Sequence, residues 1–218
     1  MFFSQLFNFT IYHFDVIISS LVGHLALVIV SLALSIVIAL PLGFALSQWK
    51  KLSTVVLSIF SVIYSIPSLS LLSFFVPITG LGFNTAIIAL FFYSQFILLR
   101  NVITGFSSVD KAELEAGRGM GLNVVQMFFW VELPLAAPTV ISGIRIATVS
   151  TIGIATIAAS INAGGIGVLI FNGILQMDFA KMFWGAVLSS GLALFANQIL
   201  SDFERVALLK TKGQLIEE

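Results

Sequence analysis

The chain has no cysteine, only two histidines and few charged residues. Without cysteine it can form neither disulfides nor thiolate metal sites, and His13 and His24 are too few for a metal cluster. Lys and Arg together number 10, as do Asp and Glu, so the formal net charge of +0 offers no basic surface for nucleic acid. We therefore expect no metal, no nucleic-acid partner and no catalytic residue in this chain.

What the sequence does contain is apolar. Of its 218 residues 59% are hydrophobic and 9% are charged, and the mean hydropathy is +1.11. This composition predicts an all-α polytopic membrane protein, because ordinary globular proteins are about a quarter charged. No long polar region could fold as a separate domain, so we expect residues 1–218 to form one transmembrane domain. The first residues lack the positive charge of a secretory signal, so we expect the amino terminus to be retained.

Long uncharged runs predict five membrane spans. Val16 to Gln48 and Leu52 to Leu99 carry no charge, and the second run is too long for one crossing, so Pro77, Gly80 and Gly82 are expected to divide it. The predicted spans are residues 20–47, 52–76, 83–99, 135–161 and 182–200.

Two residues inside these spans have open interpretations. Pro67 in the second span should kink a helix, with nearby serines satisfying the freed carbonyl. The kink is either a gate hinge or plain architecture. His24 lies near the outer end of the first span, and it is either an interfacial or hydrogen-bonded histidine or part of a transport route.

The fourth span carries small residues at every fourth position, on which another helix can approach closely. This stripe either packs two helices tightly or lines a pathway between two subunits. Its members are Thr139, Gly143, Ala147, Thr151, Ala155 and Ala159. Arg145 also lies in this span, and we expect its guanidinium to sit near the interface, to snorkel, or to face protein.

The segment from Ile161 to Asp178 is glycine-rich and then briefly apolar. Because it is too short to cross a bilayer, we interpret it as a loop followed by an interfacial or re-entrant helix. Gly164, Gly165 and Gly167 are its candidate gate or loop residues.

The one long polar interruption runs from Ser108 to Pro138. Asp110 followed by Glu113 has the form of a capping box, so a short helix is expected from about Lys111 to Gly121. Gly117, Gly119 and Gly121 are expected to supply C-cap conformations. Asn123 should then cap a second helix with Gln126 at its third position, and Pro134 marks where the next element takes over.

Lysine and arginine set the predicted orientation. One side of a five-span arrangement carries Lys50, Lys51, Arg100, Lys111, Arg118, Arg205, Lys210 and Lys212, and the other side carries Lys181. The positive side is expected to be cytoplasmic. The amino terminus is then outside, and residues 108–134 and the carboxyl terminus are in the cytoplasm.

The polar stretch resembles the EAA signature of permeases of type I ATP-binding cassette (ABC) importers, which reads EAA, three residues, G, nine residues, I, one residue, LP. The matching residues are Glu115, Ala116, Gly117, Gly121, Val131, Leu133 and Pro134. Two departures keep the size and shape of the residue: Gly117 replaces the second alanine and Val131 replaces isoleucine. The resemblance implies a five-span importer core in which Glu115, Ala116, Gly117 and Gly121 belong to a helix that couples to the ATPase.

Further segments resemble the osmoprotectant branch of this family, which imports glycine betaine, carnitine and choline. They are residues 66–72, 100–105, 115–121, 131–147 and 163–167. The resemblance implies a bacterial inner-membrane permease in contact with lipid, working as a dimer with a second copy or a paralogue. It also implies cytoplasmic ATP-binding subunits, which hold ATP and Mg, and an extracellular substrate-binding protein. A permease for methionine or another amino acid is the first alternative, and a secondary transporter subunit is the second.

Overall fold

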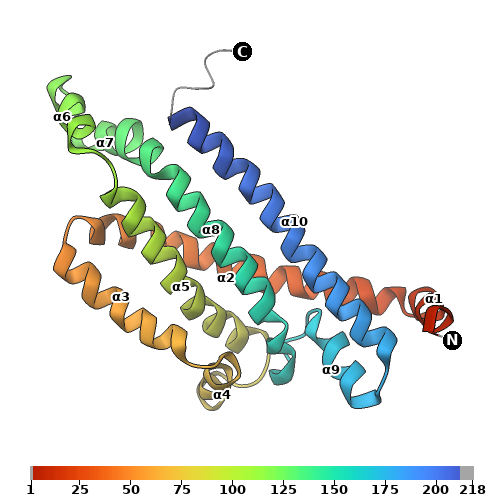
Figure 1. Ribbon diagram of the computed structural model, residues 1–218. Helices are drawn as coiled ribbons and strands as arrows, with labels where there is room; N and C mark the ends of the chain where they lie inside the picture. Colours follow the sequence, from red (N-terminus) through yellow and green to blue (C-terminus); the bar gives the residue numbers. More distant parts are fainter. Residues whose placement is uncertain (1, 212–218) are drawn as a thin grey trace.

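The computed structural model describes residues 2–211, where it contains helices and no strand (Figure 1). The elements in order are α1 (Phe2–Tyr12), α2 (Phe14–Ser47), α3 (Lys50–Ser65), α4 (Ser68–Thr79), α5 (Phe83–Ser107), α6 (Lys111–Gly119), α7 (Val124–Met127), the π-helix η1 (Phe128–Glu132), α8 (Leu133–Ala155), the 3₁₀-helix η2 (Ile157–Ile161), α9 (Gly167–Gln176) and α10 (Phe179–Thr211). The expected all-α class is confirmed. Lys212, which contributed to the predicted orientation, lies outside the described residues.

Within residues 2–211, four helical stretches are long and apolar enough to cross a membrane, and a fifth crossing exists if the bent pair α3 and α4 counts as one. The four are α2, α5, α10 and the continuous run from Val124 to Ala155. Helices α2, α5 and α10 extend beyond their predicted spans, because hydropathy marks only the apolar part of a helix whereas the backbone hydrogen bonds continue past it. The run from Val124 to Ala155 begins before its predicted span and also ends before it. The helix α1 was not predicted.

The prediction that the second span is one kinked helix is wrong. The chain breaks at Ile66 and Pro67, and α3 and α4 meet at 96°. Both residues have extended backbone, as expected for a proline and the residue before it. The carbonyl that Pro67 would free in a continuous helix is that of Ile63, and it accepts from the Ile66 amide at 3.1 Å and not from a serine as predicted. The Ile66 carbonyl accepts from the Tyr93 hydroxyl of α5. Pro67 is therefore the N-cap of α4.

The turn that ends α4 contains the glycines but not the proline expected there. Gly80 and Gly82 have positive φ angles of 82° and 113°, which favour glycine. Pro77 instead lies inside α4. The chain therefore turns at the two glycines and enters α5 at Phe83.

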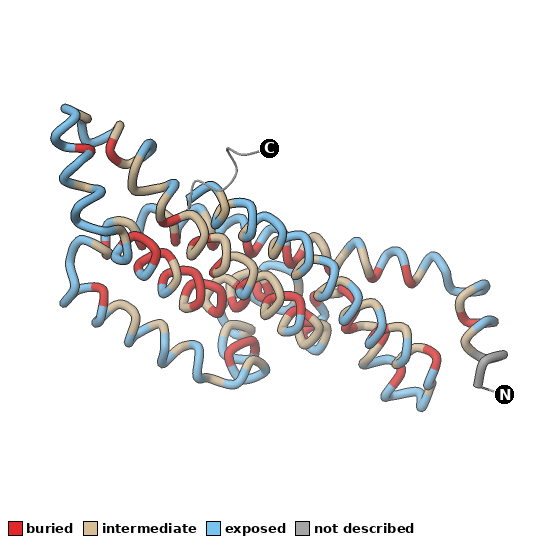
Figure 2. The backbone as a smooth tube through the Cα atoms, turned by 45° about the horizontal axis from the view of Figure 1, so that its top comes forward, coloured by how far each residue is buried: buried red, intermediate tan, exposed pale blue. Residues whose placement is uncertain are grey.

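Helix α5 lies at the centre of the molecule, packed against α2, α3, α4 and α8. Of its most apolar 18 residues 61% are buried, compared with 11% for α10, which packs on α8 and α9 at the edge. Figure 2 shows the buried residues gathered in the central helices. Polar bonds add to this packing: the Gln95 amide donates to the Ser35 carbonyl at 3.1 Å, and the Ser94 and Thr151 hydroxyls are 3.0 Å apart.

The small-residue stripe of α8 faces α5. A Cβ on Gly143 would collide with the Asn101 side chain, and one on Gly105 would lie 3.3 Å from Thr139. These contacts support the packing interpretation, with Gly143, Ala147, Thr151 and Ala155 all buried within this chain. Helix α8 ends at Ala155, so the expected continuous helix to Ile161 is wrong, and Ala159 lies in η2.

His24 and Arg145, the two span residues whose environment was left open by the sequence, both face protein. His24 is fully buried, and its Nε2 lies 3.2 Å from the Ile152 carbonyl of α8, so the hydrogen-bonded alternative is confirmed. Arg145 points from α8 to α10, where its Nε is 2.9 Å from Glu204 Oε2 and its Nη1 donates to Asn197 Oδ1 at 3.2 Å. Of the three environments expected for Arg145, the protein-facing one is observed.

Candidate functional site

The candidate site is the end of the molecule formed by α6, the turn after it and α7, which we name the α6–α7 tip (Figure 1). Helix α6 begins at Lys111, as predicted, because the Asp110 side chain accepts a hydrogen bond from the Ala112 amide at 3.0 Å. Glu113 in its first turn and Arg118 in its last turn have the signs that favour a helix dipole. Nine residues so arranged form a short, well-capped helix.

The turn after α6 is a Schellman motif. The Leu122 amide donates to the Gly117 carbonyl at 3.3 Å, and the Gly121 amide donates to the Arg118 carbonyl at 2.9 Å. Gly121 occupies the left-handed position of this motif with a φ of 77°. The prediction of a C-cap glycine is therefore right for Gly121 and wrong for Gly117 and Gly119, which lie inside α6.

Gly117 is the point where α6 rests on the rest of the tip. It is buried, and a Cβ placed on it would lie 2.6 Å from the Met127 Sδ and 3.4 Å from Val131 Cγ2. The Met127 thioether fills the space that an alanine methyl would take. This contact gives a physical reason for glycine where the EAA pattern has its second alanine.

Helix α7 begins at the predicted cap, Asn123, where the structure shows a full capping box. The capping box predicted for Asp110 and Glu113 is instead an N-cap bond from Asp110 to the Ala112 amide. The Asn123 side chain accepts from the Gln126 amide and the Gln126 side chain accepts from the Asn123 amide, both at 2.9 Å. The prediction of a separate second helix is wrong, because α7 continues through the π-helix η1 into α8 without a break. The tip is therefore covalently and helically continuous with a membrane span.

Two prolines stand at the base of α8, just beyond the π-helix. Pro134 lies in the first turn and Pro138 lies one turn later, and each lacks the amide that an α-helix would use. The Pro134 carbonyl, left free by Pro138, accepts a hydrogen bond from the Thr211 hydroxyl of α10 at 3.5 Å. Helix α10 therefore touches α8 where the tip joins it.

The surface of the tip carries a group of exposed apolar residues beside the charged side chains of α6. Met120 is 73% exposed, Val124 84% and Val125 64%. The side chains of Glu115 and Ala116 are also exposed on α6. An exposed apolar cluster with a charged rim is typical of a protein-binding surface.

The structure gathers only some of the predicted residues. Glu115, Ala116, Gly117 and Gly121 lie together in the tip, and Leu133 and Pro134 lie at the base of α8. Sequence reasoning missed Met120, Val124 and Val125, together with Met127 beneath Gly117. The signal available for them was a group of apolar residues directly after the glycine turn of a polar segment.

The glycine loop belongs to the opposite end of the molecule. Gly164 and Gly165 have positive φ angles of 82° and 80°, and a Cβ on Gly165 would lie 3.1 Å from His24 Nδ1. A Cβ on Gly167 would collide with the Thr156 carbonyl. Gly165 and Gly167 let the loop pack closely against α2 and the end of α8, whereas Gly164 has nothing within 4 Å of a Cβ and is required only by its backbone conformation. Helix α9, which follows this loop, and helix α4, which begins after Pro67, both lie away from the tip (Figure 1).

The family model and the curated relatives that match this chain are all membrane components of transport systems. Residues 31–203 match the family described as binding-protein-dependent transport system inner membrane component. The chain is 40% identical over 182 residues to a choline transport system permease protein, OpuBB, of Bacillus subtilis, with 84% of each chain covered. It is 38% identical to the osmoprotectant import permease protein OsmW of Salmonella typhimurium, covering 87% of this chain and 90% of the other.

Among solved structures, the inward-facing methionine ABC transporter MetNI contains a similar chain. The TM-score is 0.79 at 24% identity, with 88% of this chain and 96% of that chain covered. At this identity the likeness concerns the fold alone.

Proposed function

Because the chain belongs to the family of binding-protein-dependent transport system inner membrane components, we propose that it is the permease of an ATP-driven importer for quaternary amines such as choline, betaine and carnitine. It is a membrane transport subunit and not an enzyme, since hydrolysis in this family belongs to a partner ATPase. The observation that carries the substrate class is the 38–40% identity to permeases named for choline and osmoprotectants. Likeness to the methionine transporter concerns the fold and does not favour methionine.

The α6–α7 tip is the part proposed to bind the ATPase, which holds ATP and Mg. Its exposed apolar residues offer contact area, and Glu115 with Ala116 lies on the same exposed helix. Gly117 seats α6 on Met127, so the two short helices move as one body. Motion of the ATPase would pass through α7 and η1 directly into α8, as rigid elements transmit displacement.

The exposed hydroxyl groups of α3 support a pathway between two permeases. Its hydroxyl-bearing residues Thr54, Ser58 and Ser65 are exposed in this chain, although the helix is apolar enough to form part of a span. Polar groups at membrane depth ordinarily face protein or water. We infer a second copy or a paralogue opposite α3, with lipid around the remaining spans. The amino terminus and α9 would then be outside, facing an extracellular substrate-binding protein, and the tip and carboxyl terminus would be cytoplasmic.

Transport by the reconstituted complex tests this proposal. The permease, its ATPase and its binding protein are placed in vesicles, and uptake of radiolabelled choline, betaine, carnitine and methionine is measured with and without ATP. ATP-dependent uptake of a quaternary amine is expected. Uptake of methionine alone, or gradient-driven uptake by the lone chain without ATP, would overturn the assignment.

Substitutions in the tip test the coupling role. Glu115→Lys and Gly117→Leu should leave ATP hydrolysis measurable and membrane insertion intact but abolish most ATP-driven uptake. The first variant reverses a charge on α6, and the second removes the close contact between α6 and Met127. Gly191→Leu, on α10 and outside the tip, is the control for Gly117→Leu, since nothing lies within 4 Å of a Cβ at Gly191. Normal uptake by the Glu115→Lys complex would contradict the role of the tip.

A further inference from the structure

The turn η1, which joins the tip to α8, is the one π turn within residues 2–211. The Leu133 amide bonds to the Phe128 carbonyl, five residues back, whereas an α-helix would bond four residues back. The turn therefore holds one extra residue. Single π turns inside α-helices are uncommon and are frequent at functional sites, and sharp bends in helices occur at such turns and at prolines.

The backbone of this joint lacks hydrogen bonds that a regular helix would make. The Phe129 carbonyl could accept from the Leu133 amide in an α pattern or from residue 134 in a π pattern. The Leu133 amide is bonded to Phe128, and Pro134 has no amide. One turn later Pro138 removes a second amide. The base of α8 is therefore held by fewer backbone bonds than a regular helix of the same length.

Side-chain packing holds one side of η1 and leaves the other side free. The Phe128 ring lies in an aromatic cluster, with its centroid 4.6 Å from that of Phe44 and 5.8 Å from that of Phe106. In contrast, Phe129 is 58% exposed and Trp130 is 66% exposed. The turn can therefore change shape on its exposed side while Phe128 stays in the cluster.

Pockets lie on both sides of the joint. One of about 430 Å³ lies between α2, α5 and the start of α8, and its lining includes Leu40, Phe44 and Leu133. Another of about 360 Å³ lies between α6, η1, α8 and the end of α10, and its lining includes Trp130 and Pro134. Close packing normally resists the displacement of a helix. Space on both sides gives this joint room to move.

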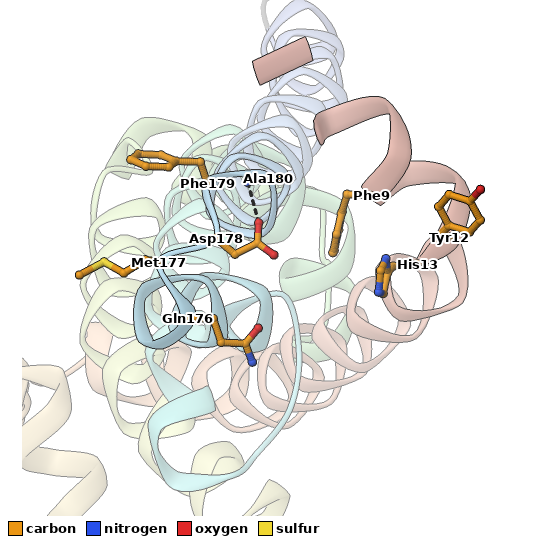
Figure 3. Close-up of a pocket in the computed structure, with 8 residues that line it drawn as sticks. All are labelled: Phe9, Tyr12, His13, Gln176, Met177, Asp178, Phe179 and Ala180. Atoms are coloured by element: carbon orange, nitrogen blue, oxygen red, sulfur yellow. Dashed lines mark hydrogen bonds between the residues drawn. The ribbon is translucent and has the colours of Figure 1, made fainter. Parts of the chain in front are cut away.

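The start of α10, at the opposite end of the molecule, has a regular backbone beside a pocket. In Figure 3 the dashed line marks the bond from the Ala180 amide to Asp178 Oδ1, 3.0 Å long, and the Lys181 amide bonds to the same oxygen at 3.3 Å. Helix α10 has neither a proline nor a π turn from Phe179 to Thr211. A pocket alone therefore does not make a hinge, and η1 differs by its backbone.

We propose that η1 is a hinge whose wide turn changes between π and α hydrogen bonding, so that the tip tilts on α8 while the helical backbone stays continuous. In the α form the Leu133 amide bonds to Phe129 instead of Phe128, so this amide keeps one partner in both forms. The proposal rests on the proposed function, because the ATPase supplies the force that tilts the tip.

Deletion of Phe129 tests the hinge by removing the extra residue. The Leu133 amide then follows Phe128 by four residues, so the bond already present closes an α turn. In the reconstituted complex, ATP hydrolysis should remain measurable while ATP-driven choline uptake falls about tenfold, within the usual range for lost coupling between two sites. Phe129→Ala is the matched control, since it removes the same exposed ring and keeps the residue, and it should transport like the wild type.

The distance between two spin labels measures the motion itself. The chain has no cysteine, so Ala112→Cys on α6 and Ile146→Cys on α8, both exposed, place one label on each side of η1. In the permease–ATPase complex in lipid nanodiscs, ATP should shift this distance in the labelled wild type and in Phe129→Ala but not in the deletion variant. An equal shift in all three, or no shift in any, overturns the hinge.

A second pair of variants keeps the test decisive if the deletion variant does not fold. Pro134→Ala supplies an amide that can bond to Phe129 or Trp130 and so stiffens the joint, whereas Pro138→Ala adds an amide one turn beyond it. The label shift should shrink in Pro134→Ala alone; an unchanged shift there, or an equal loss in both, overturns the hinge. A label shift in the wild type without choline uptake overturns the substrate assignment alone, whereas uptake without a label shift overturns the hinge alone.

Discussion

At Gly143 the backbones of α5 and α8 approach too closely for any side chain. A Cβ there would collide with Asn101, whose own amide is held by a bond to the Ile97 carbonyl at 2.8 Å. Asn101 therefore has little freedom to give way. The central packing of the molecule depends on this position, since Ala147 and Thr151 follow on the same buried face.

Gly143→Ala should lower the stability of the purified permease by about 1–3 kcal/mol, the usual cost of overpacking a close contact. The measurement is thermal unfolding in detergent. Gly153→Ala is the control on the same helix, because nothing lies within 4 Å of its Cβ, and it should be neutral or slightly stabilising. Equal melting temperatures for the two variants would show that α5 and α8 do not meet as described.

At the scale of elements, the turn between α6 and α7 depends on backbone conformation alone. Gly121 has a φ of 77°, and nothing lies within 4 Å of a Cβ placed on it. Gly121→Ala should therefore destabilise the tip by about 1 kcal/mol, from strain and not from a clash. Amide hydrogen exchange in α6 should become several times faster, while the melting temperature of the central helices stays unchanged.

Gly119→Ala is the companion variant, since its surroundings are equally open and its φ is not in the left-handed region. It should leave exchange in α6 unchanged or slow it, because alanine is the better helix former. If both variants accelerate exchange equally, then the loss of glycine itself and not the left-handed backbone explains the effect.

Elements whose causes are local could be predicted from the sequence. The starts of α6 and α7 follow from Asp110 and Asn123, whose side chains bond to amides two and three residues away. The start of α5 follows from the glycines before Phe83. The 96° break between α3 and α4 could not be predicted, because what satisfies the Ile66 carbonyl is Tyr93, 27 residues away. A proline predicts a bend, but tertiary contacts set its angle.

The candidate site, like the helix boundaries, could be predicted only where its causes are local in sequence. The EAA spacing identified Glu115, Ala116, Gly117 and Gly121, which lie together in the tip. The close contact of Gly117 with the Met127 side chain could not be predicted, because no spacing rule connects the two residues. The continuity of α7 with α8 was also hidden, because Pro134 reads as a boundary in sequence although the helical backbone runs through it.

At the scale of the whole molecule, α8 and α10 connect the two ends. Helix α8 continues the tip, and α10 runs from Phe179 at the other end to Thr211 beside Pro134. Between these ends the two helices are joined by the pair of Arg145 and Glu204, supported by Asn197. The side chains of the pair are 28% and 27% exposed, so the pair is partly shielded from water.

This ion pair should bind α10 to α8 during the motion proposed for the tip. Arg145→Glu and Glu204→Arg should each cost about 1–2 kcal/mol, less than for a fully buried pair because both groups keep partial exposure. The double exchange, Arg145→Glu with Glu204→Arg, should recover most of the stability and of the ATP-driven uptake, since the opposite charges still face each other. Asp202→Arg, an exposed carboxylate on the same helix, controls for the added charge. If the losses of the two single variants simply add in the double variant, the two helices are held together by apolar packing alone and α10 moves independently of this pair.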